Sequence, residues 1–71
     1  IVKVYPNPVK DKLFIQGLSS LANISVYNLL GKLVLSRTTS SEIDVNNLQS
    51  GIYIIKIKDQ QREVIKKFIK N

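Results

Sequence analysis

The chain of 71 residues contains no cysteine, no histidine, no methionine and no tryptophan. Without cysteine it can form no disulfide bond and no thiolate metal site. Without histidine it lacks the residue that most often serves as a general base or zinc ligand. Its three glycines stand far apart, so there is no glycine-rich loop to bind phosphate. We therefore expect a domain that is not an enzyme, with no catalytic residues, no metal and no cofactor.

Long apolar runs are also missing. No segment approaches the roughly 18 apolar residues of a membrane-spanning helix, and the N-terminus does not resemble a signal peptide. The chain begins at Ile1 and not at methionine. We interpret residues 1–71 as one domain cut from a longer polypeptide, whose own export signal would lie upstream.

Acidic residues are few, and the formal net charge is +6. A basic balance can attract nucleic acid, anionic lipid or anionic glycan, although solubility is the simpler explanation. Nucleic-acid binders of this size stack bases on aromatic side chains, and the five aromatics here are scattered. Only Phe14 and Tyr27 could lie close together, if the second and third predicted strands pair. We expect no nucleic-acid partner.

Isoleucine, valine and leucine are abundant and recur in short alternating segments bounded by turn residues. Such segments at a spacing of about 8–12 residues are typical of a β-sandwich or barrel. The sequence predicts an all-β domain of about seven strands, at residues 1–5, 11–16, 23–28, 32–38, 41–45, 51–58 and 63–70. A helix is the second choice for the last segment.

Alternation assigns inward faces to several of these strands. The predicted core positions are Leu13, Ile15, Ile24, Val26, Ile43 and Val45. Segment 51–58 is apolar on both faces, which predicts a central strand or a second covered face. Segment 32–38 has three consecutive apolar residues, so its register stays open, and segment 63–70 leaves its inward side unassigned. Between 23–28 and 32–38, Gly31 is placed to adopt the positive φ of a tight hairpin.

Two acidic residues share a strand face. Glu42 and Asp44 are two residues apart, and such a pair could hold calcium or act as an acid and base. A solvated face opposite Ile43 and Val45 is the simpler explanation, and we favour it.

Both prolines lie near the N-terminus. Pro6 and Pro8 have fixed φ angles and no N–H donor, so Pro6-Asn7-Pro8 should end the first strand. We expect this bend to set the point where the upstream chain leaves the sandwich. Near the other end, Gly51 should permit a sharp turn into its strand, and Tyr53 should pack its ring inward with the hydroxyl near the rim.

The order of three motifs carries more information than any one of them. They are Pro6-Asn7-Pro8, then Leu48-Gln49-Ser50-Gly51-Ile52-Tyr53, and finally the basic and apolar end Lys66-Lys67-Phe68-Ile69-Lys70. With this order and spacing, the whole chain closely resembles the type A C-terminal sorting domain of the type IX (Por) secretion system of Bacteroidota.

The resemblance implies a small immunoglobulin-like antiparallel β-sandwich at the end of a larger secreted protein. It implies a sorting signal that directs this cargo through the periplasm to the outer-membrane translocon, for release or cell-surface attachment. Implied partners are the translocon and shuttle components, a sortase-like peptidase and the upstream cargo. The terminal segment from Lys66 to Lys70, an exposed strand with a basic edge, would be recognised.

Two alternatives remain. One is an accessory, glycan-binding module of a secreted enzyme, which three co-planar exposed aromatic rings would favour. The other concerns assembly, because an exposed terminal strand could add to the sheet edge of another copy and form a strand-mediated homodimer.

Overall fold

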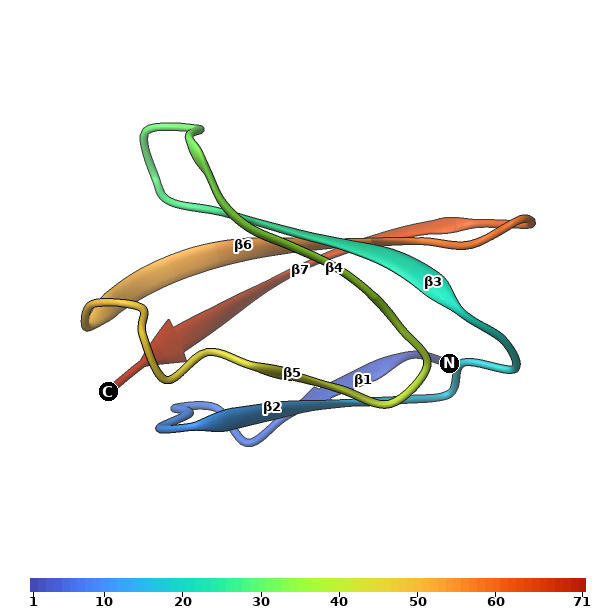
Figure 1. Cartoon of the computed structure of the whole chain (residues 1–71), viewed down its shortest axis with the longest axis horizontal. Coiled ribbons are helices and arrows are strands. Elements are labelled where there is room, and N and C mark those ends of the chain that lie inside the picture. Colours follow the sequence, from blue (N-terminus) through green and yellow to red (C-terminus); the bar gives the residue numbers. More distant parts are fainter.

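Two antiparallel sheets pack face to face in the computed structural model, which describes all residues 1–71 (Figure 1). The strands are β1 Lys3–Tyr5, β2 Lys12–Gln16, β3 Ala22–Tyr27, β4 Leu33–Thr39, β5 Glu42–Asp44, β6 Gly51–Lys58 and β7 Glu63–Lys70. One sheet has the order β1-β2-β5 and the other β4-β3-β6-β7. The predicted all-β sandwich of seven strands is confirmed, and the helical alternative for the last segment is wrong. No helix in the structure has the length and apolar character needed to cross a membrane.

The sandwich is immunoglobulin-like. In that architecture the first, second and fifth strands share one sheet, and the third, sixth and seventh share the other. Here β4 lies beside β3, on the four-stranded sheet, where the constant-type arrangement places it beside the fifth strand. The seven strands therefore follow the immunoglobulin order, with only the fourth strand in the other sheet.

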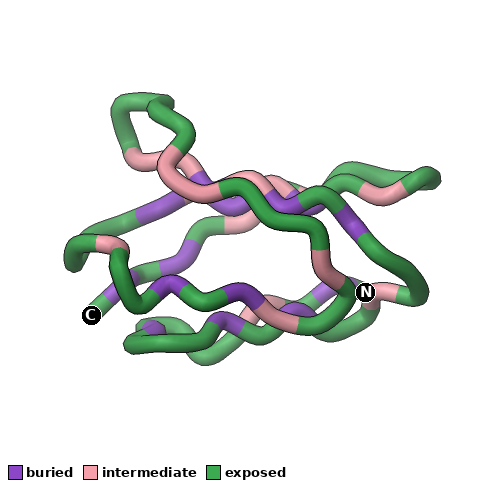
Figure 2. The backbone as a smooth tube through the Cα atoms, viewed as in Figure 1, coloured by how far each residue is buried: buried purple, intermediate pink, exposed green.

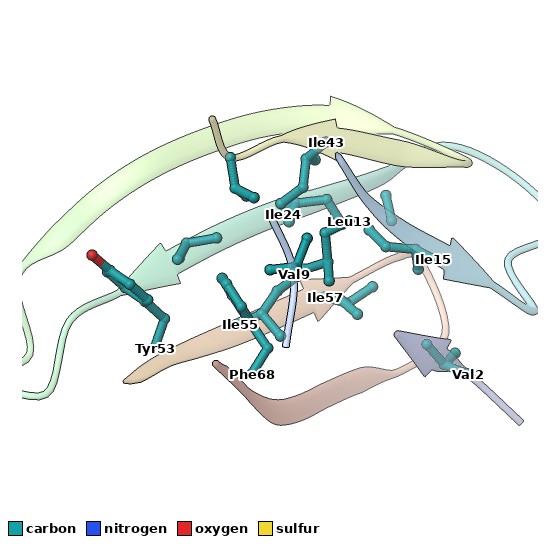
Figure 3. Packing of buried hydrophobic residues seen from close by; sticks show 13 residues of the cluster. Val2, Val9, Leu13, Ile15, Ile24, Ile43, Tyr53, Ile55, Ile57 and Phe68 are labelled. Atoms are coloured by element: carbon teal, nitrogen blue, oxygen red, sulfur yellow. The ribbon is translucent and has the colours of Figure 1, made fainter. Parts of the chain in front are cut away.

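The core lies between the two sheets and consists of 13 buried apolar residues (Figures 2 and 3). All six predicted core positions are among them: Leu13, Ile15, Ile24, Val26, Ile43 and Val45. Each occupies the inward phase of its strand's alternation, as period-two patterning requires. Phe68, Ile55 and Val9 fill the space between the sheets beside Leu13 (Figure 3).

Strand β6 occupies a central position, between β3 and β7. Tyr53, Ile55 and Ile57 point into the core, whereas Ile52 is 41% exposed on the other face. The central position explains the apolar residues of β6, and no other layer of the chain covers its second face.

A β-bulge settles the register of β4. Val26 pairs with Leu35, but the next residue, Tyr27, pairs with Leu33, so Val34 is the additional residue. The bulge lets Val34 and Leu35 both pack against the core while Leu33 faces solvent. Gly31, in the turn between β3 and β4, has the predicted positive φ, at 85°.

Candidate functional site

Strand β7 is the edge strand of the four-stranded sheet and contains the third sequence motif. It pairs with β6 along its whole length, from Glu63 opposite Lys58 to Lys70 opposite Gly51. Its even-numbered residues face the core and its odd-numbered residues face solvent. The alternation assigns the inward side that the sequence left open.

The first motif closes the outer edge of β7. The backbone N–H of Ile69 donates to Asn7 Oδ1 at 2.8 Å, and Asn7 Nδ2 donates to the carbonyl of Lys67 at 3.5 Å. Val9 N–H donates to the carbonyl of Ile69 at 2.8 Å, and Asn71 N–H donates to the carbonyl of Val9 at 2.9 Å. We call this set of contacts, made by Asn7 and Val9 to residues 67–71, the clasp. The clasp covers the C-terminal half of an edge that would otherwise be open.

The position of the prolines differs from the expectation. β1 does end at Tyr5, immediately before Pro6, and both peptide bonds that precede the prolines are cis. However, the bend lies beside the C-terminal end of β7, whereas Ile1 lies at the other end of the sandwich beside Gly17 (Figure 1). The bend therefore does not set where the upstream chain leaves. Sequence reasoning missed this because the partner of Asn7 lies 62 residues away.

The second motif contains a tyrosine corner. Tyr53 lies near the start of β6, its ring is buried, and its hydroxyl donates to the backbone carbonyl of Gln49 at 2.7 Å. This contact is a hallmark of immunoglobulin-like sandwiches. The ring also stacks on Phe68 of β7, with centroids 5.5 Å apart. The predicted inward ring and rim hydroxyl of Tyr53 are confirmed.

Two other residues of this motif shape the same corner. Leu48 is half-buried against the core, and its N–H donates to the carbonyl of Val45 at 3.0 Å. Gly51 has a φ of 154°, a value that residues with a side chain rarely adopt. The corner and the clasp both lie at the C-terminal end of β7, so the structure brings all three motifs together.

The expectation of an exposed basic end is correct only in part. Lys67 and Ile69 are exposed, but Lys66 is half-buried and Phe68 is fully buried. Lys70 is 7% exposed, and its ammonium group donates to the carbonyl of Asn71 at 3.0 Å. The difference arises because each even-numbered residue of β7 points between the sheets. Phe68 and Lys70 are therefore unsuited to direct recognition in this conformation.

The acidic residues make structural contacts. Glu42 forms an ion pair with Lys12 at 3.3 Å, and Asp44 accepts a hydrogen bond from the backbone N–H of Asn46. The backbone N–H groups of Gln61 and Arg62 hold the pKa of Asp59 below its usual value, with a smaller contribution from the Arg62 charge. Asp59 belongs to the turn between β6 and β7, at the end of the sandwich away from the clasp. No group of three or more acidic side chains gathers in a way that could hold a metal ion.

The aromatic residues do not form a binding platform of three rings. Phe14 and Tyr27 lie on different sheets, so the expectation that they could be neighbours is wrong. Phe14 instead stacks on Tyr5, with centroids 5.7 Å apart and both rings partly exposed. A single exposed pair does not favour the glycan-binding alternative.

Sequence comparison adds one finding. The family model described as secretion system C-terminal sorting domain matches residues 3–71, which is nearly the whole chain. No curated protein sequence matches the chain.

Proposed function

The chain belongs to the family of C-terminal sorting domains of the type IX secretion system, which is distributed among Bacteroidota, and from this premise we propose that it directs an attached cargo protein through that system. Members of this family are sorting signals and not catalysts. We infer that this domain, too, catalyses nothing and acts by being recognised. The observation that carries the proposal is the family match over residues 3–71.

The arrangement of the chain ends supports this role. Ile1, the point at which an upstream cargo would be attached, is 98% exposed. It lies at the opposite end of the sandwich from Asn71, and the molecule is 31 Å long (Figure 1). A bulky cargo at Ile1 would therefore leave the corner, the clasp and the end of β7 open to a partner.

The proposed route begins with export of the whole protein to the periplasm. Translocon and shuttle components would then bind the sandwich and carry the cargo across the outer membrane. A sortase-like peptidase would cut upstream of Ile1, and the cargo would be released or joined to the cell surface.

A strand-mediated homodimer has less support than recognition by a partner. The C-terminal half of the β7 edge is already hydrogen-bonded to the Asn7 side chain and to the backbone N–H of Val9. Only its N-terminal half, near Glu63 and Ile65, is free of the clasp. A second strand would have few backbone groups with which to pair.

The test is a fluorescent reporter that carries an N-terminal export signal and residues 1–71 at its C-terminus. It is produced in a Bacteroidota host with an intact type IX translocon and in a matched host without one. We expect fluorescence in the medium or on the cell surface only with the translocon, and not for the reporter without residues 1–71. Retention of the folded fusion in the periplasm of both hosts would contradict the proposal.

A further inference from the structure

The side of the four-stranded sheet that faces away from the core carries a group of apolar side chains. We call it the outer apolar face, and it consists of Tyr27, Leu33, Ile52, Ile54, Ile65 and Ile69. Strand pairing places Ile52 opposite Ile69, and Tyr27 opposite both Leu33 and Ile54. Ile65 is 61% exposed, Leu33 is 49% exposed, and Ile52 and Ile69 are each 41% exposed. Exposed apolar side chains in adjacent positions mark a contact surface more often than the same number scattered singly.

The turn between β3 and β4 extends this face. Leu29 and Leu30, which we call the tip, are 65% and 94% exposed. The turn projects from the sandwich (Figure 1), and a side-chain carbon added at Gly31 would meet nothing within 4 Å. The tip is followed by Leu33 of the outer apolar face, so the two surfaces adjoin. Its sequence signal is a pair of adjacent leucines within an otherwise polar turn.

Internal hydrogen bonds hold the tip in one conformation. Asn28 Oδ1 accepts from the N–H groups of Leu30 and Lys32, both at 3.0 Å. The backbone of Asn28 also donates to Lys32 and accepts from Gly31, both at 3.0 Å. A turn ordered in advance loses little further entropy when its apolar side chains enter a partner.

The outer face of the three-stranded sheet, on the opposite side of the molecule, carries mainly charged side chains. On the three-stranded sheet the outward positions of β2 and β5 include Lys12, Glu42 and Asp44, with the Tyr5–Phe14 pair as the exposed apolar feature. The concentration of exposed aliphatic side chains on β4, β6, β7 and the tip is therefore specific to one face.

The charges around this face are mostly positive. Lys67 is exposed beside Ile65 and Ile69, and Lys32 follows the tip. Lys56 lies 6.0 Å from the ring centroid of Tyr27 and 3.8 Å from Glu63, the single acid on these strands. A surface with this pattern is complementary to an apolar surface bordered by carboxylates.

We propose that the outer apolar face and the tip form the surface by which the domain docks on a protein component of the export machinery, and that this component presents apolar side chains bordered by carboxylates. This inference rests on the proposed function and names the surface and the chemistry of the partner. The tip enters a pocket of the partner, the outer apolar face packs against it, and Lys32 and Lys67 face its carboxylates.

Charge argues against the two other occupants. Binding to an anionic membrane through an inserted tip needs a cluster of cations around the insertion point, and Lys32 is the single cation within the turn. A second copy of the chain would bring the lysines of two like faces together, which like charge opposes. Neither objection applies to a partner protein with acidic residues around its binding surface.

The experiment uses the reporter fusion in the host with the translocon and compares exposed residues on the two sides of the domain. Test variants are Leu30→Ser, Ile65→Ser and Lys67→Glu. Matched controls are Leu21→Ser, at a residue that is 64% exposed in a distant turn, and Lys3→Glu on the three-stranded sheet. Thermal unfolding of each isolated domain verifies that the fold is retained.

We expect the test variants to lower export about tenfold or more, as expected for the loss of an interface anchor, while both controls are exported like the parent. Export of all variants at the parent level would overturn the docking surface and leave the proposed function intact. Failure of the parent fusion itself would instead remove the proposed function, and the inference with it.

Two further measurements address the other occupants. The domain and its Leu30→Ser variant are mixed with vesicles of phosphatidylcholine and phosphatidylglycerol, and both are examined by sedimentation equilibrium. We expect no vesicle binding and a monomer. Vesicle binding or a dimer that Leu30→Ser abolishes would overturn the proposal in favour of the membrane or of self-association.

Discussion

Asn7 Oδ1 accepts a hydrogen bond of 2.8 Å from the backbone N–H of Ile69, which joins two residues that lie 62 positions apart. With the second contact, from Asn7 Nδ2 to the carbonyl of Lys67, the side chain acts as a short piece of strand. An uncovered edge strand is a template for unwanted pairing, so this side chain protects the end of β7 as well as holding it.

Replacement of Asn7 by alanine should destabilise the domain by about 1 kcal/mol, because exposed hydrogen bonds contribute roughly this amount. Urea unfolding measures the change, and hydrogen exchange should show faster exchange of the Ile69 amide. Asn47→Ala is the matched control, because the Asn47 side chain makes no hydrogen bond. Unchanged protection of Ile69 in Asn7→Ala would show that the clasp does not depend on this side chain.

Replacement of Tyr53 by phenylalanine keeps the ring on Phe68 and removes only the hydroxyl that donates to Gln49. The free energy of unfolding should fall by about 1 kcal/mol, because the carbonyl loses its partner. Tyr27→Phe is the control, since the Tyr27 hydroxyl makes no hydrogen bond, and it should change stability little. Equal effects of the two substitutions would count against the tyrosine corner.

Removal of residues 66–71 should unfold the domain. The deletion takes away Phe68, which is fully buried, together with the hydrogen bonds of the clasp. Loss of a buried phenylalanine side chain alone costs about 3–5 kcal/mol, against about 4–10 kcal/mol for the stability of a domain of this size. Circular dichroism and amide NMR dispersion measure the outcome.

A failure of this truncated domain to direct export would therefore not distinguish recognition from folding. Lys67→Glu, at an exposed position of the same segment, should remain folded and is the better probe of recognition. If the truncated domain retained native amide dispersion, the role assigned to Phe68 would be wrong.

Asp59 should make stability depend on acid. Its pKa is lower in the folded state than the ordinary value of 3.8, mainly because backbone N–H groups of Gln61 and Arg62 donate to the carboxylate. A lowered folded pKa contributes stability above the unfolded pKa, and this contribution is lost as pH falls through the folded pKa. Asp59→Asn should therefore be less stable than the parent at neutral pH, and the difference should shrink toward about pH 2. Urea unfolding at both values tests this, and a difference that does not vary with pH would contradict it.

The strands and most of the core could be predicted from local patterns. Alternation with period two is visible within five or six residues, so the inward positions of β2, β3 and β5 followed from the sequence. The ends of β6 and β7 also followed, because turn residues bound both segments. Consecutive apolar residues in β4 gave no such signal, and a bulge determined its register.

The residues of the candidate site could be predicted from the sequence, but the contacts between them could not. Three motifs were visible in the sequence, and their order indicated the family, but their contacts were not. The burial of Lys70 depends on which face of β7 meets the core, and that is settled by its pairing with β6. Likewise the exposure of Ile52 and Ile69 follows from the absence of any layer over the four-stranded sheet.

By itself the sequence determined the strands, the inward residues of β2, β3 and β5, and the family, because each of these depends on short-range periodicity or on motif order. The tertiary structure alone decided that Asn7 and Val9 clasp β7, that Phe68 and Lys70 turn inward, and that one face gathers exposed apolar residues. These features depend on which edges and faces meet, either within the β6–β7 pair or, in the clasp, across about sixty residues. Hydrogen bonds and packing between distant segments leave no periodic trace in the chain.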